Sequence, residues 1–94
     1  MIVVRNHFVA KPGCASKLAT LLKEAAAVGN IPKHRVLTDM VGEMNQVVLE
    51  IEAENLAGFE AMMKEYSTNE QFREKMKGYT DLWLTGDRQI LQIV

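Results

Sequence analysis

The segment QVVLEIEA at residues 46–53 alternates between two kinds of side chain with a period of two. Positions 47, 49 and 51 are branched apolar residues, whereas positions 46, 50 and 52 are polar. This spacing is typical of a β-strand that packs one face on a core and turns the other to a wetter environment. A chain with such a strand must also supply partner strands and a layer that covers the apolar face.

The first half of the chain predicts a strand, a helix and a second strand. Residues 2–9 are rich in β-branched side chains, and a Lys-Pro-Gly turn follows them. Residues 14–28 carry apolar side chains at helical spacing, and Gly29 ends the pattern. Residues 33–41 predict another strand, which a short turn joins to residues 46–53 as a hairpin.

The second half predicts a long helical region and a last strand. Residues 55–80 carry an apolar stripe that a polar stretch interrupts. Thr68 and Gln71 have the spacing of a capping box, so we expect a second helical piece to restart there. Residues 82–87 are expected to form a connection, and residues 88–94 the last strand.

This order of elements predicts a ferredoxin-like βαββαβ arrangement of the α+β class. With 94 residues, the chain is expected to form one such domain over residues 1–94. Right-handed crossovers place strands 2–9 and 46–53 at the centre of one antiparallel sheet. Both helical regions then cover the same face, and the other face stays bare in a single subunit.

The bare face of the predicted sheet is too apolar for open water and too polar for a dry core. Its central residues are Val3, Arg5, His7, Val9, Val48 and Glu50. Arg5 and Glu50 fall near the middles of neighbouring strands, where we expect an ion pair. A second copy of the same sheet would suit this mixed surface, so we predict a homodimer in which two sheets face each other.

Charge balance and cysteine usage exclude several classes of function. Eleven basic and twelve acidic residues give a net charge of −1 without a basic run, so no nucleic-acid partner is expected. The apolar runs are too short to span a membrane, and the N-terminus lacks the pattern of a secretory signal. A single cysteine, Cys14, and the absence of metal-ligand spacings favour a cytoplasmic protein without a metal site.

Two segments resemble a known group of proteins, namely NHFVAKPG before the first helix and EYSTNEQFREKMKGYTDLWLTGDRQILQIV at the C-terminal end. The sequence resembles the dimeric α+β barrel superfamily, in particular antibiotic-biosynthesis-monooxygenase-like and NIPSNAP-like domains. The resemblance implies a dimeric α+β barrel built from ferredoxin-like subunits. Some members oxidise aromatic polyketides without a cofactor, others degrade haem, and others are isomerases or decarboxylases.

The resemblance does not extend to the haem-degrading members. Those proteins use an Asn on the first strand, a Trp on the second helix and a later His. Asn6 matches the first of these, but the Trp position holds Met62 or Met63, and both histidines precede residue 35. The resemblance therefore implies a small aromatic or apolar ligand and no cofactor.

Asn6 faces the helices in the predicted fold and is the first candidate catalytic residue. It could hold a substrate carbonyl or an oxygenated intermediate in a pocket between sheet and helices. Alternatively, it is a buried amide that bonds to nearby backbone. The candidate substrate-binding walls are Met62, Met63, Tyr66, Phe72 and Met76, which could equally be ordinary core filler.

His7 and Glu50 are the candidates for proton transfer and complete the catalytic set. An unperturbed imidazole has a pKa of about 6.5, which suits a general base. Alternatively, His7 bonds across the dimer and Glu50 belongs to ion pairs that fix its register. Trp83 is expected to plug the end of the sheet or the dimer contact.

Three functional hypotheses arise from these residues. The first is a cofactor-independent monooxygenase-like enzyme acting on a small aromatic or apolar metabolite. The second is a non-catalytic dimeric module that binds a small molecule or responds to stress, and the third is dimeric assembly as the whole function. A pocket that contains Asn6 and a second polar group favours the enzyme, whereas solid packing of the methionine and aromatic side chains favours the module.

Overall fold

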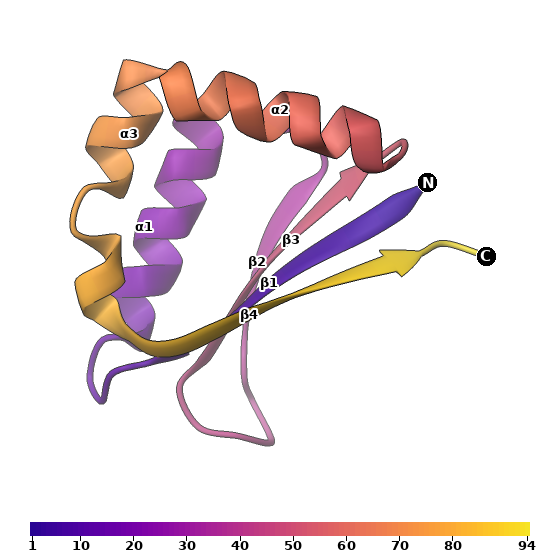
Figure 1. Ribbon diagram of the computed structural model, residues 1–94. Coiled ribbons are helices and arrows are strands. Elements are labelled where there is room, and N and C mark those ends of the chain that lie inside the picture. Colours follow the sequence, from indigo (N-terminus) through magenta and orange to yellow (C-terminus); the bar gives the residue numbers. More distant parts are fainter.

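Four antiparallel strands form one sheet in the computed structural model, which describes all of residues 1–94. The strands are β1 (Ile2–Ala10), β2 (His34–Thr38), β3 (Gln46–Ala53) and β4 (Trp83–Gln92). Their order across the sheet is β2-β3-β1-β4, so β1 and β3 are central (Figure 1). This order and the sequence of elements confirm the predicted ferredoxin-like α+β fold.

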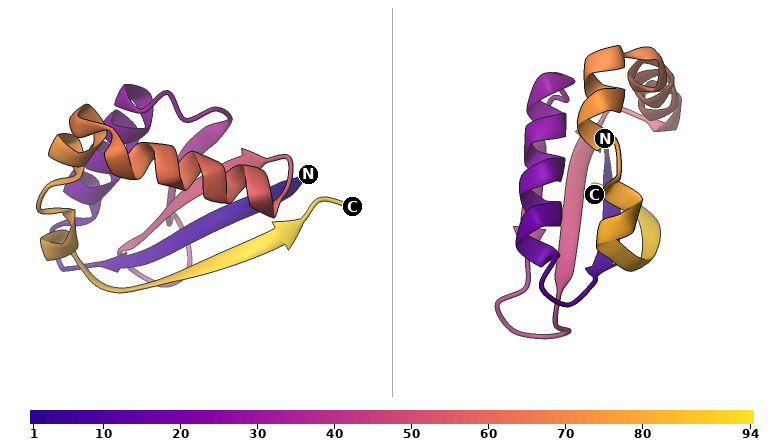
Figure 2. Two further views of the ribbon diagram at one scale, coloured as in Figure 1. Left: turned by 45° about the horizontal axis from the view of Figure 1, so that its top comes forward. Right: turned by 90° about the vertical axis from the view of Figure 1, so that its left-hand side faces the viewer.

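The helices all lie on one face of the sheet (Figure 2). They are α1 (Ala15–Val28), α2 (Leu56–Thr68) and α3 (Glu70–Met76), followed by one 3-10 turn, η1 (Tyr79–Leu82). The chain measures 35 × 35 × 18 Å, which is the thickness of two layers rather than three. The face of the sheet opposite the helices is therefore bare in the single subunit, and we call it the open face.

The core forms where α1 crosses the central strands. Leu18 and Leu22 of α1 belong to one core cluster with Val47 and Ile51 of β3, and all four side chains are fully buried, as is Val4 of β1. Each such side chain stabilises the fold by about 1.5–3 kcal/mol relative to an exposed position. The even positions of β1 and the odd positions of β3 thus face the helices, as their alternation predicts.

The prediction that residues 82–87 form a connection is wrong, because β4 already begins at Trp83. Gly86 lies inside β4 opposite Phe8, and a Cβ atom there would come within 3.1 Å of the Phe8 ring. A glycine inside a strand marks such a close approach of a neighbouring side chain. The strand predicted over 33–41 is also shorter and ends at Thr38.

The break between α2 and α3 lies one residue beyond the predicted cap. Asn69, rather than Thr68, caps α3, and its side-chain oxygen accepts from the Phe72 backbone N–H at 3.0 Å. The Thr68 hydroxyl instead donates back to the Glu65 carbonyl oxygen at 2.9 Å. An Asn at the N-cap satisfies one of the free donors at a helix start. The cap turns the chain, so that α3 runs back along α1.

Candidate functional site

A cavity of about 590 Å³ lies between the helix-covered face of the sheet and helices α2 and α3. Its floor comes from β1, β3 and β4, and its walls come from α2, α3 and η1. Most of the lining is hydrophobic, and the aromatic and sulfur-containing members are Phe8, Met63, Tyr66, Phe72, Met76, Tyr79 and Trp83. A larger surface hollow of about 1010 Å³ at α3 has Val28 as its single hydrophobic lining residue, so we regard it as a solvated groove.

The polar end of the cavity is formed by Asn6 of β1 and Arg88 of β4, which lie opposite each other in the sheet register. Arg88 Nε donates a hydrogen bond of 2.7 Å to Asn6 Oδ1. Because an arginine cannot accept a hydrogen bond, this contact fixes the orientation of the Asn6 amide. The guanidinium carbon of Arg88 also lies 5.4 Å from the centre of the Phe59 ring.

An aromatic cluster closes the end of the cavity near η1. Phe8 lies 5.4 Å from Trp83 and 6.4 Å from Tyr79, measured between ring centres. Trp83 Nε1 is buried and has no hydrogen-bond partner in the chain. A buried donor without a partner is costly, and binding sites are one place where such groups occur. Trp83 thus lines the cavity as well as ending the sheet.

The structure places four of the five candidate substrate-binding residues in the cavity wall. These are Met63, Tyr66, Phe72 and Met76, whereas Met62 packs against the core. Met63, Tyr66 and Ser67 have i, i+3, i+4 spacing and therefore share one helix face. The Tyr66 and Phe72 rings lie 5.3 Å apart, and burial raises the pKa of the Tyr66 hydroxyl, with a smaller contribution from Glu65.

His7 lies on the open face, away from the cavity. Its Nδ1 is 2.9 Å from Asp87 Oδ1, and its Nε2 is 2.8 Å from Gln46 Oε1. Gln46 Nε2 donates to the Glu43 carbonyl oxygen, so the amide presents its oxygen to the imidazole. Both ring nitrogens therefore face acceptors. The hydrogen bond with Gln46 raises the pKa of His7, burial opposes it, and Asp87 raises it further.

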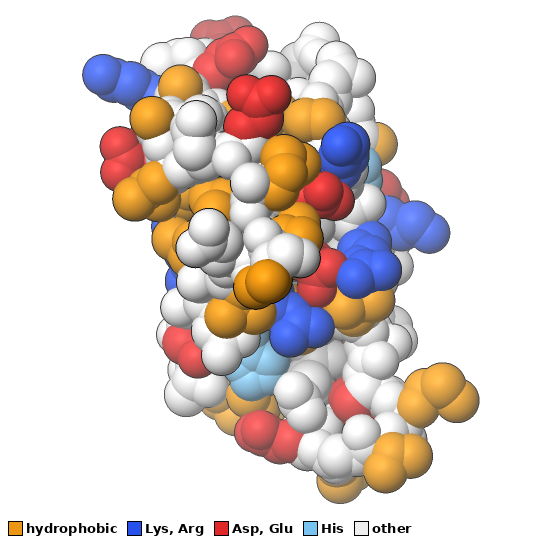
Figure 3. All heavy atoms as spheres, turned by 90° about the vertical axis from the view of Figure 1, so that its right-hand side faces the viewer, with side chains coloured by type: hydrophobic (Ala, Val, Ile, Leu, Met, Phe, Trp, Pro, Cys, Tyr) orange, Lys and Arg blue, Asp and Glu red, His pale blue; other side chains and the backbone are white.

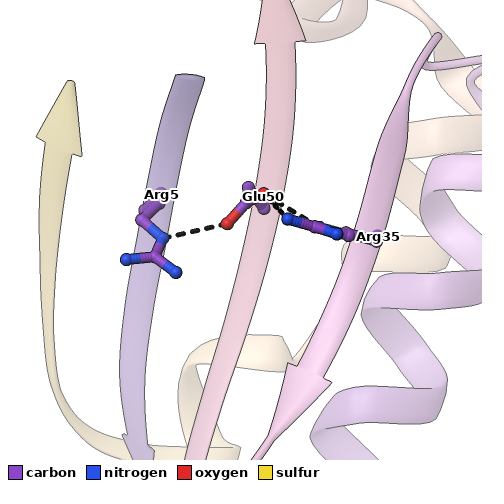
Figure 4. Close-up of polar contacts among 3 residues, drawn as sticks. All are labelled: Arg5, Arg35 and Glu50. Atoms are coloured by element: carbon purple, nitrogen blue, oxygen red, sulfur yellow. Dashed lines mark hydrogen bonds and ion pairs between the residues drawn. The ribbon is translucent and has the colours of Figure 1, made fainter. Parts of the chain in front are cut away.

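Glu50 also lies on the open face, between two arginines on neighbouring strands (Figure 4). Arg5 Nε donates to Glu50 Oε2 at 2.9 Å, and Arg35 Nη2 donates to Glu50 Oε1 at 2.6 Å. The predicted Arg5–Glu50 ion pair is present, and Arg35 extends it to a third strand. Burial by itself would raise the pKa of Glu50, but the hydrogen bonds and charges of Arg35 and Arg5 lower it overall.

The three candidate catalytic residues therefore do not converge on one site. Asn6 faces the cavity, while His7 and Glu50 lie on the opposite face of the sheet. The residue that does join Asn6 is Arg88, which the sequence did not single out. In the sequence, Arg88 stands two positions after Gly86 and therefore lies on the same face of β4. That face can be assigned to the helix-covered side only when the register with β1 is known.

The side of the molecule formed by the strands mixes charged and hydrophobic side chains (Figure 3). No group of three or more His, Cys, Asp or Glu side chains is arranged to hold a metal ion. No helix combines the length and the apolar character needed to cross a membrane. Cys14 is a free thiol next to the start of α1.

No protein-family model and no curated protein matches the sequence. Solved structures of similar fold include an uncharacterized NIPSNAP domain protein from Burkholderia xenovorans, with a TM-score of 0.84, 12% identity and coverage of 100% of this chain and 95% of that chain. A NIPSNAP family protein from Agrobacterium tumefaciens gives a TM-score of 0.87, 12% identity and coverage of 99% and 92%.

An antibiotic biosynthesis monooxygenase-like protein from Chloroflexus aurantiacus gives a TM-score of 0.76 and 13% identity, with coverage of 99% of this chain and 92% of that chain. At these identities the likeness shows the fold alone. It confirms that this chain has the fold of NIPSNAP-like and antibiotic-biosynthesis-monooxygenase-like proteins, the group that its sequence resembles.

Proposed function

We propose that the protein binds a small aromatic or apolar metabolite in the cavity between the sheet and helices α2 and α3. The observation that carries this proposal is the pairing of mainly hydrophobic walls with one polar end at Asn6 and Arg88. A volume of about 590 Å³ falls within the range of pockets that take small organic ligands. The aromatic cluster at Phe8, Tyr79 and Trp83 offers ring faces and edges to an aromatic ligand.

The first candidate for the chemistry at this site is oxidation of the ligand by molecular oxygen without a cofactor. A phenol that loses two hydrogens and gains one oxygen becomes a quinone, while the other oxygen atom leaves as water. The substrate itself supplies all the electrons, so the protein has only to bind it, orient it and exclude water. Asn6 would hold the ligand oxygen, and the fold shared with antibiotic-biosynthesis-monooxygenase-like proteins supports this candidate.

The second candidate is a non-catalytic module that binds the same class of molecule. A specific observation favours it, because His7 and Glu50 point away from the cavity. Tyr66 does line the cavity, but its raised pKa keeps the phenol protonated at neutral pH, where it cannot act as a base. The two candidates share the binding site and differ only in whether the bound ligand reacts.

A binding experiment combined with an oxygen measurement tests both candidates. Trp83 is the single tryptophan and lines the cavity, so its fluorescence should change when a naphthol, a naphthoquinone or a polyketide-like phenol binds. Ser67→Phe adds a ring to the lining of the cavity and should weaken binding, whereas Thr68→Phe adds the same ring beside it and serves as the control.

The outcomes separate the candidates. Oxygen uptake that matches ligand consumption one to one supports the enzyme, and binding without oxygen uptake supports the module. Ligands that neither quench Trp83 nor raise the melting temperature, or that bind equally to both variants, contradict the proposed site.

We also propose that two copies associate through the open face. Only 14 of the 94 residues are buried in the single subunit, and Val3, Val9 and Val48 on the open face are only half-buried. A second sheet would cover these valine side chains, which share the open face with the ion pairs that Arg5 and Arg35 make with Glu50. Val48→Glu should shift sedimentation toward the monomer, whereas Thr20→Glu on the exposed side of α1 should not. A wild-type monomer at micromolar concentration would contradict this association.

A further inference from the structure

Arg88 differs from the other arginines of the sheet in having no carboxylate partner. Arg5 and Arg35 share Glu50, and the remaining ion pairs join His7 to Asp87 and Lys75 to Glu24. The side-chain contacts of Arg88 are the hydrogen bond from Nε to Asn6 and the ring of Phe59. Both terminal nitrogens of its guanidinium group are without a hydrogen-bond partner in the chain.

The contacts that Arg88 does make hold its planar group in place. Phe59 is 3% exposed and therefore forms a firm surface beside the guanidinium group. Asn6 binds the inner nitrogen at 2.7 Å, which leaves the two outer N–H-bearing nitrogens for another partner. Two parallel donors of this kind match the two oxygens of a carboxylate and bind it in a bidentate manner.

The remaining charges around the cavity also favour an anion. Arg73 of α3 lines the cavity and has no ion pair. Asp87 is the one acidic residue near Arg88 among the lining residues, but its carboxylate bonds to His7 on the open face. The Asn6 amide is fixed with its oxygen toward Arg88, so its Nδ2 is a further donor without a partner. Donors and positive charge therefore dominate the polar end.

We infer that Arg88 is an oxyanion subsite, and that the ligand is an aromatic acid, in which an acidic oxygen pairs with Arg88 and the ring system fills the hydrophobic part of the cavity. This inference rests on the proposed function and names the class of its ligand. Asn6 acts here as a positioning residue that holds the guanidinium group, in addition to offering its own amide N–H.

Two probes of equal shape test the charge of the head group. The anion 2-naphthoate and the neutral 2-naphthamide are titrated against the full chain, with Trp83 fluorescence and calorimetry as readouts. We expect naphthoate to bind about 3- to 10-fold more tightly, because Arg88 pairs with the carboxylate while its exposure to solvent limits the gain. Arg88→Gln should remove most of this preference, and Arg88→Lys should keep part of it.

A further variant keeps the test specific. Arg35→Gln should leave the preference within about twofold of wild type, because Arg35 lies on the open face, where it binds Glu50. Near-ultraviolet circular dichroism shows that each variant is folded. Equal binding of the two probes, or a preference that survives Arg88→Gln or disappears in Arg35→Gln, overturns the inference and leaves the proposed cavity site intact. Failure of both probes to bind contradicts the cavity site itself and the inference with it.

Discussion

The polar side chains on the two faces of β1 differ in how fully their hydrogen-bonding groups are satisfied within the chain. On the open face, Arg5 and His7 find acceptors within the sheet, at 2.9 Å and 2.8 Å, and their partners are bound in turn. On the helix-covered face, Asn6 binds Arg88, and both residues keep donors that nothing in the chain satisfies. Polar groups that satisfy one another stabilise a fold, whereas donors left over beside a cavity are available to a ligand.

This difference also decides which residues are suited to proton transfer. Both oxygens of Glu50 are bound by arginines, and its lowered pKa makes it a weak base. Both nitrogens of the His7 imidazole are engaged by acceptor oxygens, and the hydrogen bond with Gln46 is the main cause of its raised pKa. The polar groups of the open face are therefore already engaged with one another, and the candidate site lies on the other side of the same strands.

Replacing neighbouring valines on β3 should give the largest contrast between the faces. Val47 is fully buried under the helices, while Val48 lies half-buried on the open face. Val47→Ala should lower the free energy of unfolding by about 2–3 kcal/mol, because two methyl groups and the cavity they leave both contribute. Val48→Ala should cost less than about 1 kcal/mol in the monomer, because its side chain is only partly removed from water.

Urea unfolding at several protein concentrations measures the free energy of unfolding of both valine variants and compares the two faces of β3. If a second subunit covers the open face, the cost of Val48→Ala should grow with protein concentration, because association stabilises the folded state by mass action. Equal costs for the two variants at low concentration would contradict the assignment of the faces.

Most of the fold could be predicted from the sequence because alternation and helical spacing act locally. The strands at 2–9 and 46–53 and the helix at 14–28 are confirmed almost to the residue. The start of β4 was missed because Gly86 and Asp87 disfavour a strand by their own propensities. Pairing with β1 overrides that preference, since Gly86 leaves room for the Phe8 ring.

The candidate site was predictable only in part, because it depends on contacts between distant segments. Alternation within β1 placed Asn6 toward the helices without any knowledge of its neighbours. Arg88 joins it across 82 residues of sequence, through a register that no local pattern reveals. The choice of Met63 over Met62 depends on the rotation of α2 about its axis, which the spacing of the apolar stripe leaves open.

Breaking the ion cluster tests whether the open face is structural. Glu50→Gln should lower the free energy of unfolding by about 1–2 kcal/mol, because two charge-assisted contacts are lost while the exposure of Arg5 and Arg35 to water limits the cost. Glu52→Gln is the matched control on the same strand and face, since its side chain makes no ion pair. Ligand binding in the cavity should be unchanged in both, and a loss of binding in Glu50→Gln would assign the open face a part in the site.

The helix caps test how firmly the cavity wall is held. Asn69→Ala removes the cap of α3, which carries Phe72 and Met76, and should cost about 1 kcal/mol. Asn55→Ala removes the same kind of cap from α2, where Asn55 Oδ1 accepts from the Gly58 N–H at 2.8 Å. Both should lower the melting temperature. Weaker ligand binding in Asn69→Ala than in Asn55→Ala would show that α3 positions the wall, whereas equal binding would show that it does not.

The smallest expected effect is the pH dependence that His7 adds to stability. Because its pKa is higher in the folded chain than its usual 6.5, the folded state binds the proton more tightly than the unfolded state. The contribution is complete below about pH 6.5 and disappears as the pH rises through the folded value. Unfolding free energies at about pH 6 and about pH 8.5 should therefore differ more for wild type than for His7→Gln, by about 0.2–1 kcal/mol as for other exposed pairs. Asp87→Asn keeps the imidazole without its carboxylate, so the loss should move to lower pH. An unchanged pH profile in both variants would mean that the open-face network does not favour the charged imidazole.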